Sequence, residues 1–273
     1  AEMINRSHPK AFMLENVDNL ITHEKGQTFH TIIDVLVNDL NYKIIGVTKG
    51  EDGKLIYDAH NFVRNSKNFG VPQNRPRVYI MGFSRAYFGN GVDNLPNALP
   101  EKRKEPLYGD LNDLLEMNAP DKYFLSSGYV ETLERHKARH EGRGNGFGYR
   151  IVNLPEIEHP ISNAILATGG SGKERNLVID PKEGVAGKIV PSKQTPLNDK
   201  GIRAMTPREW GKLQGFINYA FLDENGNDAF SFPEKLADGP RYKQFGNAVT
   251  IPAVEEMAKF MKKCLAELEK ERV

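Results

Sequence analysis

The first 83 residues alternate between short apolar runs and one amphipathic segment, and this alternation constrains the fold more than any other feature. The runs "AFMLENV" (11–17), "YKIIGVT" (42–48) and "RVYIMGF" (77–83) have the length and composition of β-strands. Between the first two runs, apolar residues from Phe29 to Leu40 recur at helical spacing, which predicts a helix over 28–40 with Thr28 as its N-cap. This order indicates an α/β sheet.

The remaining chain divides into an irregular middle and a regular end. From about 84 to 200 the sequence is rich in Gly, Pro, Asn and charge without clear periodicity, which predicts a loop-rich second domain or a long insertion. In "TPREWGKLQGF" (206–216), Thr206 and Glu209 form a predicted capping box and Gly215 a helix stop. A last helix is expected to begin near Pro252. The predicted divisions are therefore 1–83, 84–200 and 201–273.

Composition excludes several classes of protein. The single cysteine, Cys264, rules out an internal disulfide framework and a cysteine-based zinc site, and it lies on the apolar stripe of the last predicted helix. No apolar run reaches the roughly 20 residues of a membrane span, and no signal peptide is recognisable. With a net charge of +1, any nucleic-acid surface has to come from local clustering of basic residues. We expect a cytoplasmic protein without a bound metal.

The first apolar run ends on an acid and an amide, Glu15 and Asn16. In open α/β sheets, ligands bind beyond the carboxyl ends of the strands, so these two residues are candidates for a binding or catalytic site. A carboxylate there can bind the amidine-like edge of a base. The alternative is a helix cap or a surface acid after a strand.

The segment "QNRPR" (73–77) leads into the third apolar run. Gln73, Arg75 and Arg77 alternate in sequence, and the period of a strand predicts that all three lie on one face. Two guanidinium groups on that face suit a phosphate, a carboxylate or a carbonyl oxygen. The alternative is a charge cluster that protects a strand edge from aggregation, although the buried character of the following run argues against it.

Two further segments are candidates for ligand contact. In "YKQFGNAVTIP" (242–252), a Gly-Asn pair directly before a helix predicts a tight turn that lets a ligand approach the backbone, although such turns are common. Between 135 and 150 there are five Lys or Arg residues, two His and one acid. This composition suits contacts with the phosphates of a duplex, and the alternative is a solvated loop.

Four motifs occur in a specific order: "ENV" at 15–17, "QNRPR" at 73–77, "RAMTPREWGKLQGF" at 203–216 and "KQFGNAV" at 243–249. In this order, the chain resembles the C-terminal half of the DNA (cytosine-5) methyltransferases. The resemblance implies the C-terminal part of a Rossmann-like sheet of an S-adenosylmethionine-dependent methyltransferase. It also implies that 84–200 form a loop-rich target-recognition domain that binds duplex DNA.

The resemblance implies a mechanism. A cysteine thiolate attacks C6 of a cytosine that is flipped out of the duplex, C5 accepts a methyl group from S-adenosylmethionine, and loss of the C5 proton expels the cysteine. By resemblance, Glu15 holds N3 and the exocyclic amine of the base, with Asn16 next to it in the motif. Arg77 binds the cytosine O2, and Arg75 supports the same site or the DNA backbone.

The resemblance also assigns residues to the cofactor, the DNA and the scaffold. The cofactor pocket is expected to be lined by Asn247, Ala248 and Val249. The residues expected to recognise DNA lie in the glycine-rich basic stretches and are Arg143, Thr168, Gly169, Gly170, Lys173 and Arg175. Structural motif positions are Gln73, Thr206, Glu209 and Gly246. The family usually has Ser at the place of Ala248 and Thr-Leu at the place of Ala164 and Ile165, which puts the usual threonine contact in doubt, although Thr168 is near.

Motifs of the family's N-terminal half are absent from these 273 residues. There is no Phe-x-Gly-x-Gly loop and no Pro-Cys-Gln, and Cys264 has neither the proline before it nor the glutamine after it. We therefore expect the chain to be inactive alone and to need the missing half, as a separate subunit or an upstream segment. A split enzyme, a fragment and one part of a longer chain all fit this expectation.

Two other functions compete with a bacterial restriction-modification methyltransferase. One is a tRNA cytosine-5 methyltransferase of similar fold, whose recognition region carries Cys-Phe-Thr, whereas this chain has no cysteine there. The other is a stand-alone DNA-binding or regulatory module without catalysis.

Overall fold

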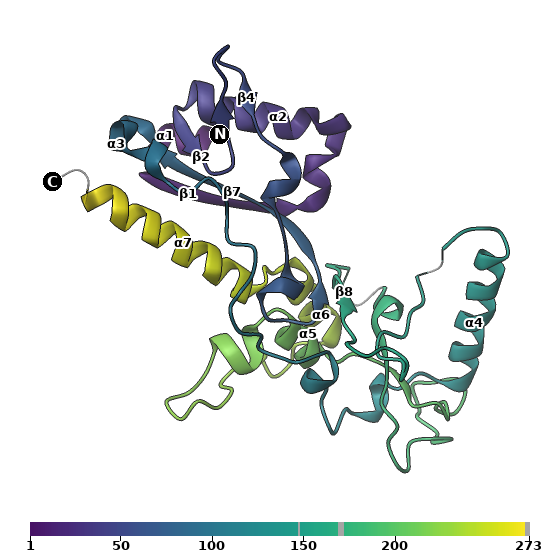
Figure 1. The fold of residues 1–273 in the computed structure, drawn as a ribbon. Helices are drawn as coiled ribbons and strands as arrows, with labels where there is room; N and C mark the ends of the chain where they lie inside the picture. The colour runs from purple at the N-terminus through teal and green to yellow at the C-terminus, as the bar shows by residue number, and fades with distance from the viewer. Residues whose placement is uncertain (147, 169–171, 271–273) are drawn as a thin grey trace. The chain divides into compact units, whose positions relative to one another are not determined.

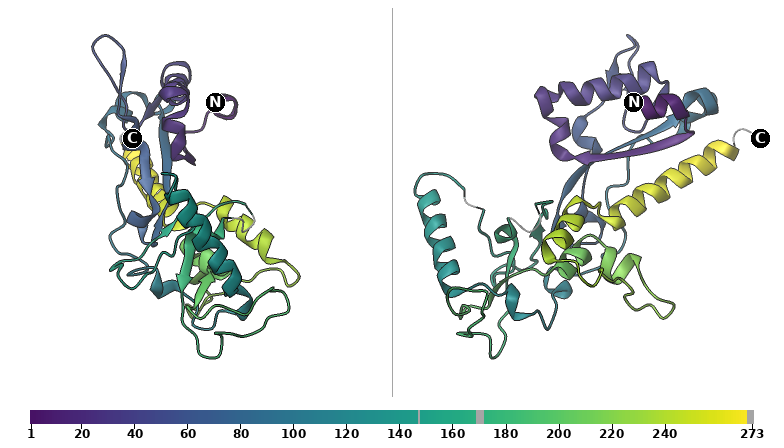
Figure 2. Two further views of the ribbon diagram at one scale, coloured as in Figure 1. Left: turned by 90° about the vertical axis from the view of Figure 1, so that its right-hand side faces the viewer. Right: turned by 180° about the vertical axis from the view of Figure 1, so that it is seen from behind.

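A computed structural model describes residues 1–146, 148–168 and 172–270, which form two compact units (Figures 1 and 2). Unit 1 contains Ala1–Phe69, Pro76–Lys104 and the chain from Ala253 onward, and unit 2 contains Gly70–Arg75 and Glu105–Pro252. The predicted divisions at 83/84 and 200/201 do not coincide with these limits. Residues 84–104 lie in unit 1, and 201–252 lie in unit 2 with most of the predicted recognition domain.

The sheet of unit 1 is built around one long strand, β7 (Pro76–Ser84). The strands β1 (Ala11–Val17), β2 (Tyr42–Ile44) and β5 (Val63–Asn65) all pair with β7 in antiparallel orientation. Because β1 and β2 both oppose β7, they run in the same direction on either side of a reversed strand. The predicted strands at 11–17 and 77–83 are confirmed, while the run at 42–48 forms β2 and the first residue of a hairpin of β3 (Thr48–Lys49) and β4 (Leu55–Ile56).

Helices cover both faces of this sheet, as the alternating side chains of β7 require. Tyr79, Met81 and Phe83 are buried in one apolar cluster with α7 (Ile251–Lys270). Val78 and Ile80 point to the other face and pack in a cluster that includes residues of α2 (Gln27–Asp34). Figures 1 and 2 show α2 and α7 on opposite sides of β7, which gives unit 1 an α/β layered architecture.

The helix predicted over 28–40 is present, but its start differs. Its N-cap is Gly26 with a φ of 88°, so the prediction of Thr28 as the cap is wrong. The chain turns earlier because Glu24 and Lys25 also adopt positive φ values of 50° and 57°. After Asp34 the helix continues as a π-helical turn over Val35–Asp39.

The C-terminal helix α7 begins at Ile251, which confirms the predicted start near Pro252. Cys264 is 1% exposed in the apolar cluster on the sheet, which confirms its predicted place in the core. Burial raises the pKa of the Cys264 thiol to about 11. In the described residues, no helix is both long and apolar enough to cross a bilayer.

Unit 2 has its own core. Helix α5 (Pro207–Leu213) packs against α6 (Asp238–Asn247), and the Trp210 and Tyr242 rings lie with centroids 4.6 Å apart. Two small sheets complete the core, one from β9 (Leu177–Ile179) and β10 (Ile202–Ala204), the other from the parallel strands β6 (Gln73–Asn74) and β8 (Ser162–Asn163).

The middle of the chain contains one long helix that the loop-rich prediction missed, α4 (Ser127–Glu141). Only Val130 and Leu133 of this helix are buried, so the helical period of apolar residues is too weak to recognise in the sequence.

Two short helices lie in unit 1, α1 (Glu2–Ser7) and α3 (Arg85–Phe88). The 3₁₀ turns are Asp18–Ile21, His23–Gly26, Ala59–Phe62, Ser66–Phe69, Gly89–Asn94, Asn112–Leu114, Asp121–Tyr123 and Lys173–Asn176, and a second π-helical turn is Phe216–Ala220.

Candidate functional site

Glu15 and Arg77 meet across the pair of strands β1 and β7. The antiparallel register places Glu15 opposite Tyr79 and Val17 opposite Arg77, so the acid and the guanidinium are diagonal neighbours on one face. Oε1 of Glu15 lies 3.1 Å from Nε of Arg77, and their side chains are 27% and 16% exposed. The sheet therefore fixes one acid and one cation side by side in a partly open position.

This ion pair leaves polar atoms available. Nη1 of Arg77 donates to the Pro76 carbonyl at 2.7 Å. Within the described part of the chain, Oε2 of Glu15 and Nη2 of Arg77 have no hydrogen-bond partner. The pair can thus present one acceptor and one charged donor to a single planar ligand.

Asn16 does not join this pair. As the next residue of the strand it points to the opposite face, where its side chain is exposed and its Oδ1 accepts a hydrogen bond from the Val17 N–H at 2.8 Å. In this structure the amide shapes the end of β1.

Gln73 and Arg75 both hold the peptide groups of Ile165. Oε1 of Gln73 accepts from the Ile165 N–H at 3.2 Å, and Nη1 of Arg75 donates to the Ile165 carbonyl at 3.0 Å. Gln73 also donates to the Leu213 carbonyl, and Arg75 donates to the carbonyls of Gly246 and Ala248 at 3.1 and 2.9 Å. With exposures of 0% and 3%, both side chains tie distant backbone segments together.

The prediction that Gln73, Arg75 and Arg77 share one face of one strand is wrong. Strand β6 ends at Asn74 and pairs with β8, whereas β7 begins at Pro76 and pairs with β1, β2 and β5. Pro76 has no N–H to continue a ladder, so the run is interrupted there and its two parts belong to different sheets.

The Gly246–Asn247 pair differs from the predicted tight turn. Both residues end helix α6, and α7 begins only at Ile251. A Cβ at Gly246 would lie 2.2 Å from the Leu166 carbonyl oxygen, so the close approach is made by the backbone of this chain. Asn247 is exposed after it, and Ala248 is half-buried.

The predicted capping box is confirmed and is part of a larger buried network. Thr206 Oγ1 accepts from the Glu209 N–H at 3.1 Å, and Glu209 Oε2 accepts from the Thr206 N–H at 2.7 Å. Both oxygens of Glu209 also accept from Arg203 at 2.7 and 2.9 Å, and Arg203 Nε donates to Asp180 at 2.6 Å. Sequence reasoning missed Arg203 and Asp180, although Arg203 is the first residue of the third motif.

The residues predicted to recognise DNA lie around one anchored segment. Asn176 bonds through Oδ1 to the Asn163 N–H at 2.7 Å and through Nδ2 to the Asn163 carbonyl at 3.2 Å. This buried amide, which sequence reasoning missed, joins the described ends of the segment that carries Thr168, Lys173 and Arg175. Gly169 and Gly170 lie outside the described residues.

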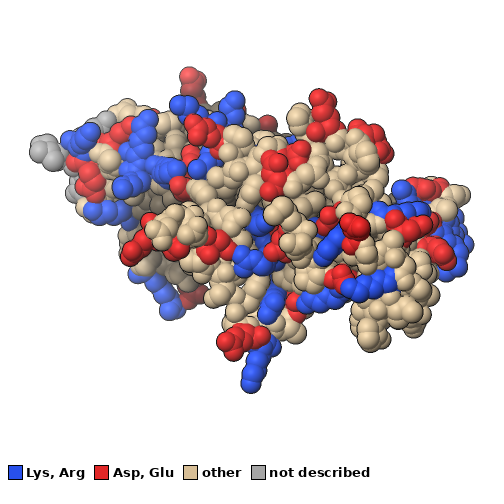
Figure 3. Space-filling model, turned by 90° about the horizontal axis from the view of Figure 1, so that it is seen from below, with Lys and Arg blue, Asp and Glu red and all other residues tan. Residues whose placement is uncertain are grey.

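The residues predicted to recognise DNA differ in their surroundings. Thr168 and Arg175 are exposed, as is Arg143 beyond the end of α4. Lys173 Nζ lies 5.2 Å from the centre of the Tyr242 ring. Basic and acidic side chains are mixed over the face of the molecule shown in Figure 3.

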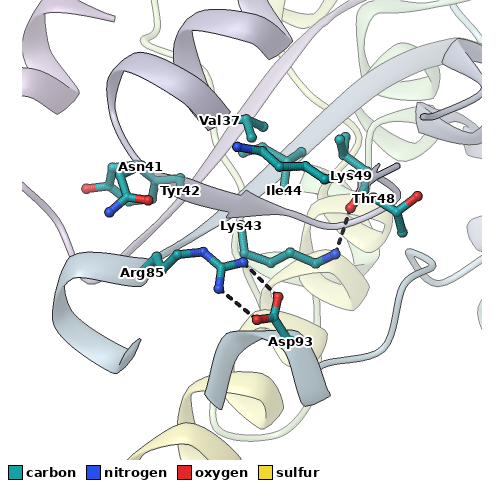
Figure 4. A pocket seen from close by; sticks show the side chains of 10 residues that line it. Val37, Asn41, Tyr42, Lys43, Ile44, Thr48, Lys49, Arg85 and Asp93 are labelled. Carbon is teal, nitrogen blue, oxygen red and sulfur yellow. Dashed lines mark hydrogen bonds and ion pairs between the residues drawn. The ribbon is translucent and has the colours of Figure 1, made fainter. Parts of the chain in front are cut away.

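A separate hollow of about 520 Å³ lies beside β2 in unit 1 (Figure 4). Arg85 and Asp93 on its wall form two hydrogen bonds of 2.7 Å, which hold the pKa of Asp93 below its usual value. Burial lowers the pKa of Lys43, whose Nζ donates to the Val47 carbonyl at 2.6 Å. Of the predicted site residues that the structure describes, none lines this hollow.

Comparison with known proteins identifies the family. Residues 1–263 match the sequence profile of the C-5 cytosine-specific DNA methylases. The chain belongs to this family. It is 41% identical over 266 residues to the type II methyltransferase M.HpaII of Haemophilus parainfluenzae, covering 95% of this chain and 62% of that protein. It is 32% identical over 272 residues to M1.ScrFI of Lactococcus lactis subsp. cremoris, covering 99% of this chain and 56% of that protein.

Solved structures support the same fold. A methyltransferase of Entamoeba histolytica, EhMeth, superposes with a TM-score of 0.54 at 17% identity, covering 94% of this chain and 63% of that protein. The S. pombe Dnmt2 methyltransferase gives a TM-score of 0.53 at 15% identity, covering 94% of this chain and 67% of that protein. These similarities confirm an α/β methyltransferase fold. The chain nevertheless spans less than two thirds of M.HpaII and M1.ScrFI.

Proposed function

We propose that this chain is the C-terminal portion of a DNA cytosine-5 methyltransferase of a bacterial restriction-modification system, acting in the cytoplasm. Its reaction transfers a methyl group from S-adenosylmethionine to C5 of a cytosine flipped out of duplex DNA. The observation that carries the proposal is the contact between Glu15 and Arg77, which leaves one carboxylate oxygen and one guanidinium nitrogen without partners among the described residues. Membership of the methylase family and the identity to M.HpaII support it.

Glu15 and Arg77 contact different atoms of the base. Attack of a thiolate on C6 moves the C5–C6 π electrons to C5 and increases the electron density at N3 and O2. Glu15 holds N3 and the exocyclic amine and favours the N3-protonated ring, while Arg77 places a fixed positive charge at O2. Their ion pair keeps both groups in position before the base arrives, which lowers the reorganisation needed during the reaction.

The nucleophile is proposed to come from outside these 273 residues. Cys264 is buried on the sheet side of α7, and its raised pKa disfavours the thiolate. Within the described residues, β1 pairs only with β7, so its other edge is available to a further strand. We propose that the missing part of the methylase domain, an upstream segment or a separate subunit, supplies the cysteine and that the chain is inactive without it.

The residues expected at the cofactor fit that role in part. The carbonyls of Gly246 and Ala248 are occupied by Arg75, which fixes the turn between α6 and α7. The exposed amide of Asn247 remains as a donor and acceptor, and the partly buried Val249 offers an apolar contact. When bound, S-adenosylmethionine supplies the electrophilic methyl group.

The scaffold motifs are proposed to present the recognition segment to DNA. Gln73, Arg75 and Gly246 hold the backbone of Ile165 and Leu166, just before Thr168. The buried Glu209 links α5 to β10 through Arg203. With its base fixed in this way, the segment can carry Thr168, Gly169, Gly170, Lys173 and Arg175 to the base edges, with Arg143 on a neighbouring loop.

The experiment tests whether adding the missing N-terminal part restores activity. This chain is combined with the N-terminal part of M.HpaII or with its own upstream coding segment, and incorporation of labelled methyl groups into duplex DNA is measured. We expect no transfer by the chain alone, transfer by the completed enzyme, and loss of transfer in E15Q. The matched control is E2Q, which removes the acid of an exposed ion pair with Arg6 in the same unit and should leave transfer unchanged.

Two results would separate the alternatives. If the completed enzyme labels no cytosine in DNA but the chain still binds duplex DNA, the binding module without catalysis replaces the proposal. Transfer to tRNA without transfer to DNA would support the tRNA methyltransferase instead.

A further inference from the structure

Charge is segregated around helix α4. Four basic side chains of this helix, each exposed or half-buried, recur at helical spacing and form one row. Arg143 continues the row beyond the end of the helix. These residues are Arg135, His136, Arg139, His140 and Arg143. The acids of the helix occupy the other half of its circumference at about 3.6 residues per turn, and they are Glu131, Glu134 and Glu141.

The packing of α4 explains which side stays free. Val130 and Leu133 pack in an apolar cluster with residues of β9 and β10, including Leu177 and Ile202. Arg135 and Arg139 lie on the helix face opposite these two residues. The row of arginines is therefore not required for the fold of unit 2.

The acids near the packed side have partners of their own. Lys200 forms an ion pair of 2.9 Å with Glu134, and Lys137 lies 3.9 Å from Glu141. In contrast, the arginines of the row have no carboxylate partner within the described residues, and Arg135 donates only to Thr132 Oγ1 at 3.4 Å. Their charges are thus available to an external anion.

The loop that follows α4 leaves room for a close approach. Gly144 adopts a φ of 73°, and a Cβ built on Gly144 or Gly146 would meet no heavy atom within 4 Å. Arg143 and this open backbone lie at the carbonyl end of the helix, where the helix dipole favours basic side chains over acidic ones. Arg143 and this loop follow directly on Glu141, the last residue of the helix, whose carboxylate faces Lys137.

We propose that Arg135, Arg139 and Arg143 bind the phosphate backbone of duplex DNA. The inference rests on the proposed function and assigns the sequence-independent part of DNA binding to one helix face. Four residues of helix rise about 6 Å, so successive arginines can reach different phosphates of a duplex that carries a charge every ~1.7 Å of its axis. The planar guanidinium fork matches a phosphate in geometry.

Because the whole chain is nearly neutral, its affinity for a polyanion depends on local clusters such as this row. Lys and Arg number 37 against 36 Asp and Glu, and the view in Figure 3 shows both signs interspersed. A polyanion therefore has little general attraction to this protein, and a local row without acids supplies most of its electrostatic affinity.

The test compares two triple variants of the full chain that each lose three positive charges. One is R135Q, R139Q and R143Q. The control is K259Q, K262Q and K263Q on the exposed side of α7. Binding to a short fluorescein-labelled duplex of mixed sequence is measured by fluorescence anisotropy over a range of NaCl concentrations, with circular dichroism as the check on folding, since Arg and Gln have similar helix propensity.

The α4 variant is expected to bind about tenfold to a hundredfold more weakly near 0.1 M salt. The slope of log K against log salt should decrease in magnitude by about 2–3, because each lost phosphate contact removes about 0.9. The α7 control should change the slope by less than about 1. Equal slopes for the two variants would overturn the inference and leave the proposed function intact, whereas failure of the unmodified chain to bind any duplex at low salt would overturn both.

Discussion

Two contacts between an arginine and a glutamate, one in each unit, use the same chemistry in opposite ways. Arg203 and Glu209 are fully buried, form two hydrogen bonds with each other, and find further partners in Asp180 and the Thr206 N–H. Arg77 and Glu15 share one contact of 3.1 Å, are partly exposed, and keep a donor and an acceptor that no described residue engages. Completeness of hydrogen bonding therefore separates a structural ion pair from one that is available to a ligand.

A third ion pair is more exposed to solvent than either of these two. Arg85 and Asp93 form two hydrogen bonds but have side chains that are 32% and 54% exposed. Water competes with such a pair, so the pair contributes little to stability. The three pairs therefore predict three different responses to mutation.

The largest effect is expected at the buried pair. In E209Q, the buried Arg203 loses one of its two carboxylate partners among the described residues and keeps only Asp180, so the free energy of unfolding should fall by about 3–5 kcal/mol. Urea denaturation of the chain measures this change. The exposed acid Glu234 supplies the control E234Q, which should lower stability by less than about 0.5 kcal/mol. A loss below about 1 kcal/mol in E209Q would show that the pair is not the anchor described here.

The next effect is expected at the partly open pair, and it should appear in activity. In the completed enzyme, R77Q removes the charge proposed to face the cytosine O2, and methyl transfer should fall by about 10²–10³. Because the pair is partly solvated, the free energy of unfolding should change by less than about 1 kcal/mol. The control R6Q at the exposed pair on α1 should affect neither quantity. A similar loss in R6Q would argue against a specific role for Arg77.

A smaller effect is expected at the backbone contact that supports the recognition segment. In G246A, the added Cβ would lie 2.2 Å from the Leu166 carbonyl oxygen, so the recognition segment or α6 has to shift. We expect a loss of about 1–3 kcal/mol in unfolding free energy. The control G146A adds its methyl group in open space and should be nearly neutral. Equal stability of both variants would contradict the close approach.

The smallest effect is expected at the exposed pair. The hydrogen bonds from Arg85 lower the pKa of Asp93 in the folded state, so their stabilisation is present above the unfolded pKa near 4 and is lost as the pH falls through the lower folded value. D93N should cost at most about 1 kcal/mol at neutral pH and should remove this acid dependence. Thermal unfolding at pH 7 and pH 3 measures it, and a larger loss at pH 3 than at pH 7 would contradict the account.

Local patterns in the sequence were sufficient where short-range chemistry determines the structure. The strand at 11–17, the capping box of Thr206 and Glu209, and the start of α7 follow from the sequence because alternation, capping and proline position act within a few residues. The pattern failed at α4, where only two side chains are buried, and at the N-cap of α2, where a glycine with positive φ replaces a side-chain cap.

Long-range partners could not be predicted from spacing. Arg75 reaches carbonyls of Ile165, Gly246 and Ala248, which are 90 or more residues away, and no local signal indicates these contacts. The convergence of Glu15 and Arg77 was expected from the resemblance to the methylases, but the register that makes them diagonal neighbours is a property of the folded sheet.

A double-mutant cycle tests most directly whether Glu15 and Arg77 act on the same base. Single-turnover methyl transfer is measured for the completed enzyme and for E15Q, R77Q and the double variant. If both residues hold one cytosine, the double variant should be about as slow as the slower single variant, with a coupling of at least about 1 kcal/mol in activation free energy. Losses that multiply, with no coupling, would contradict the account.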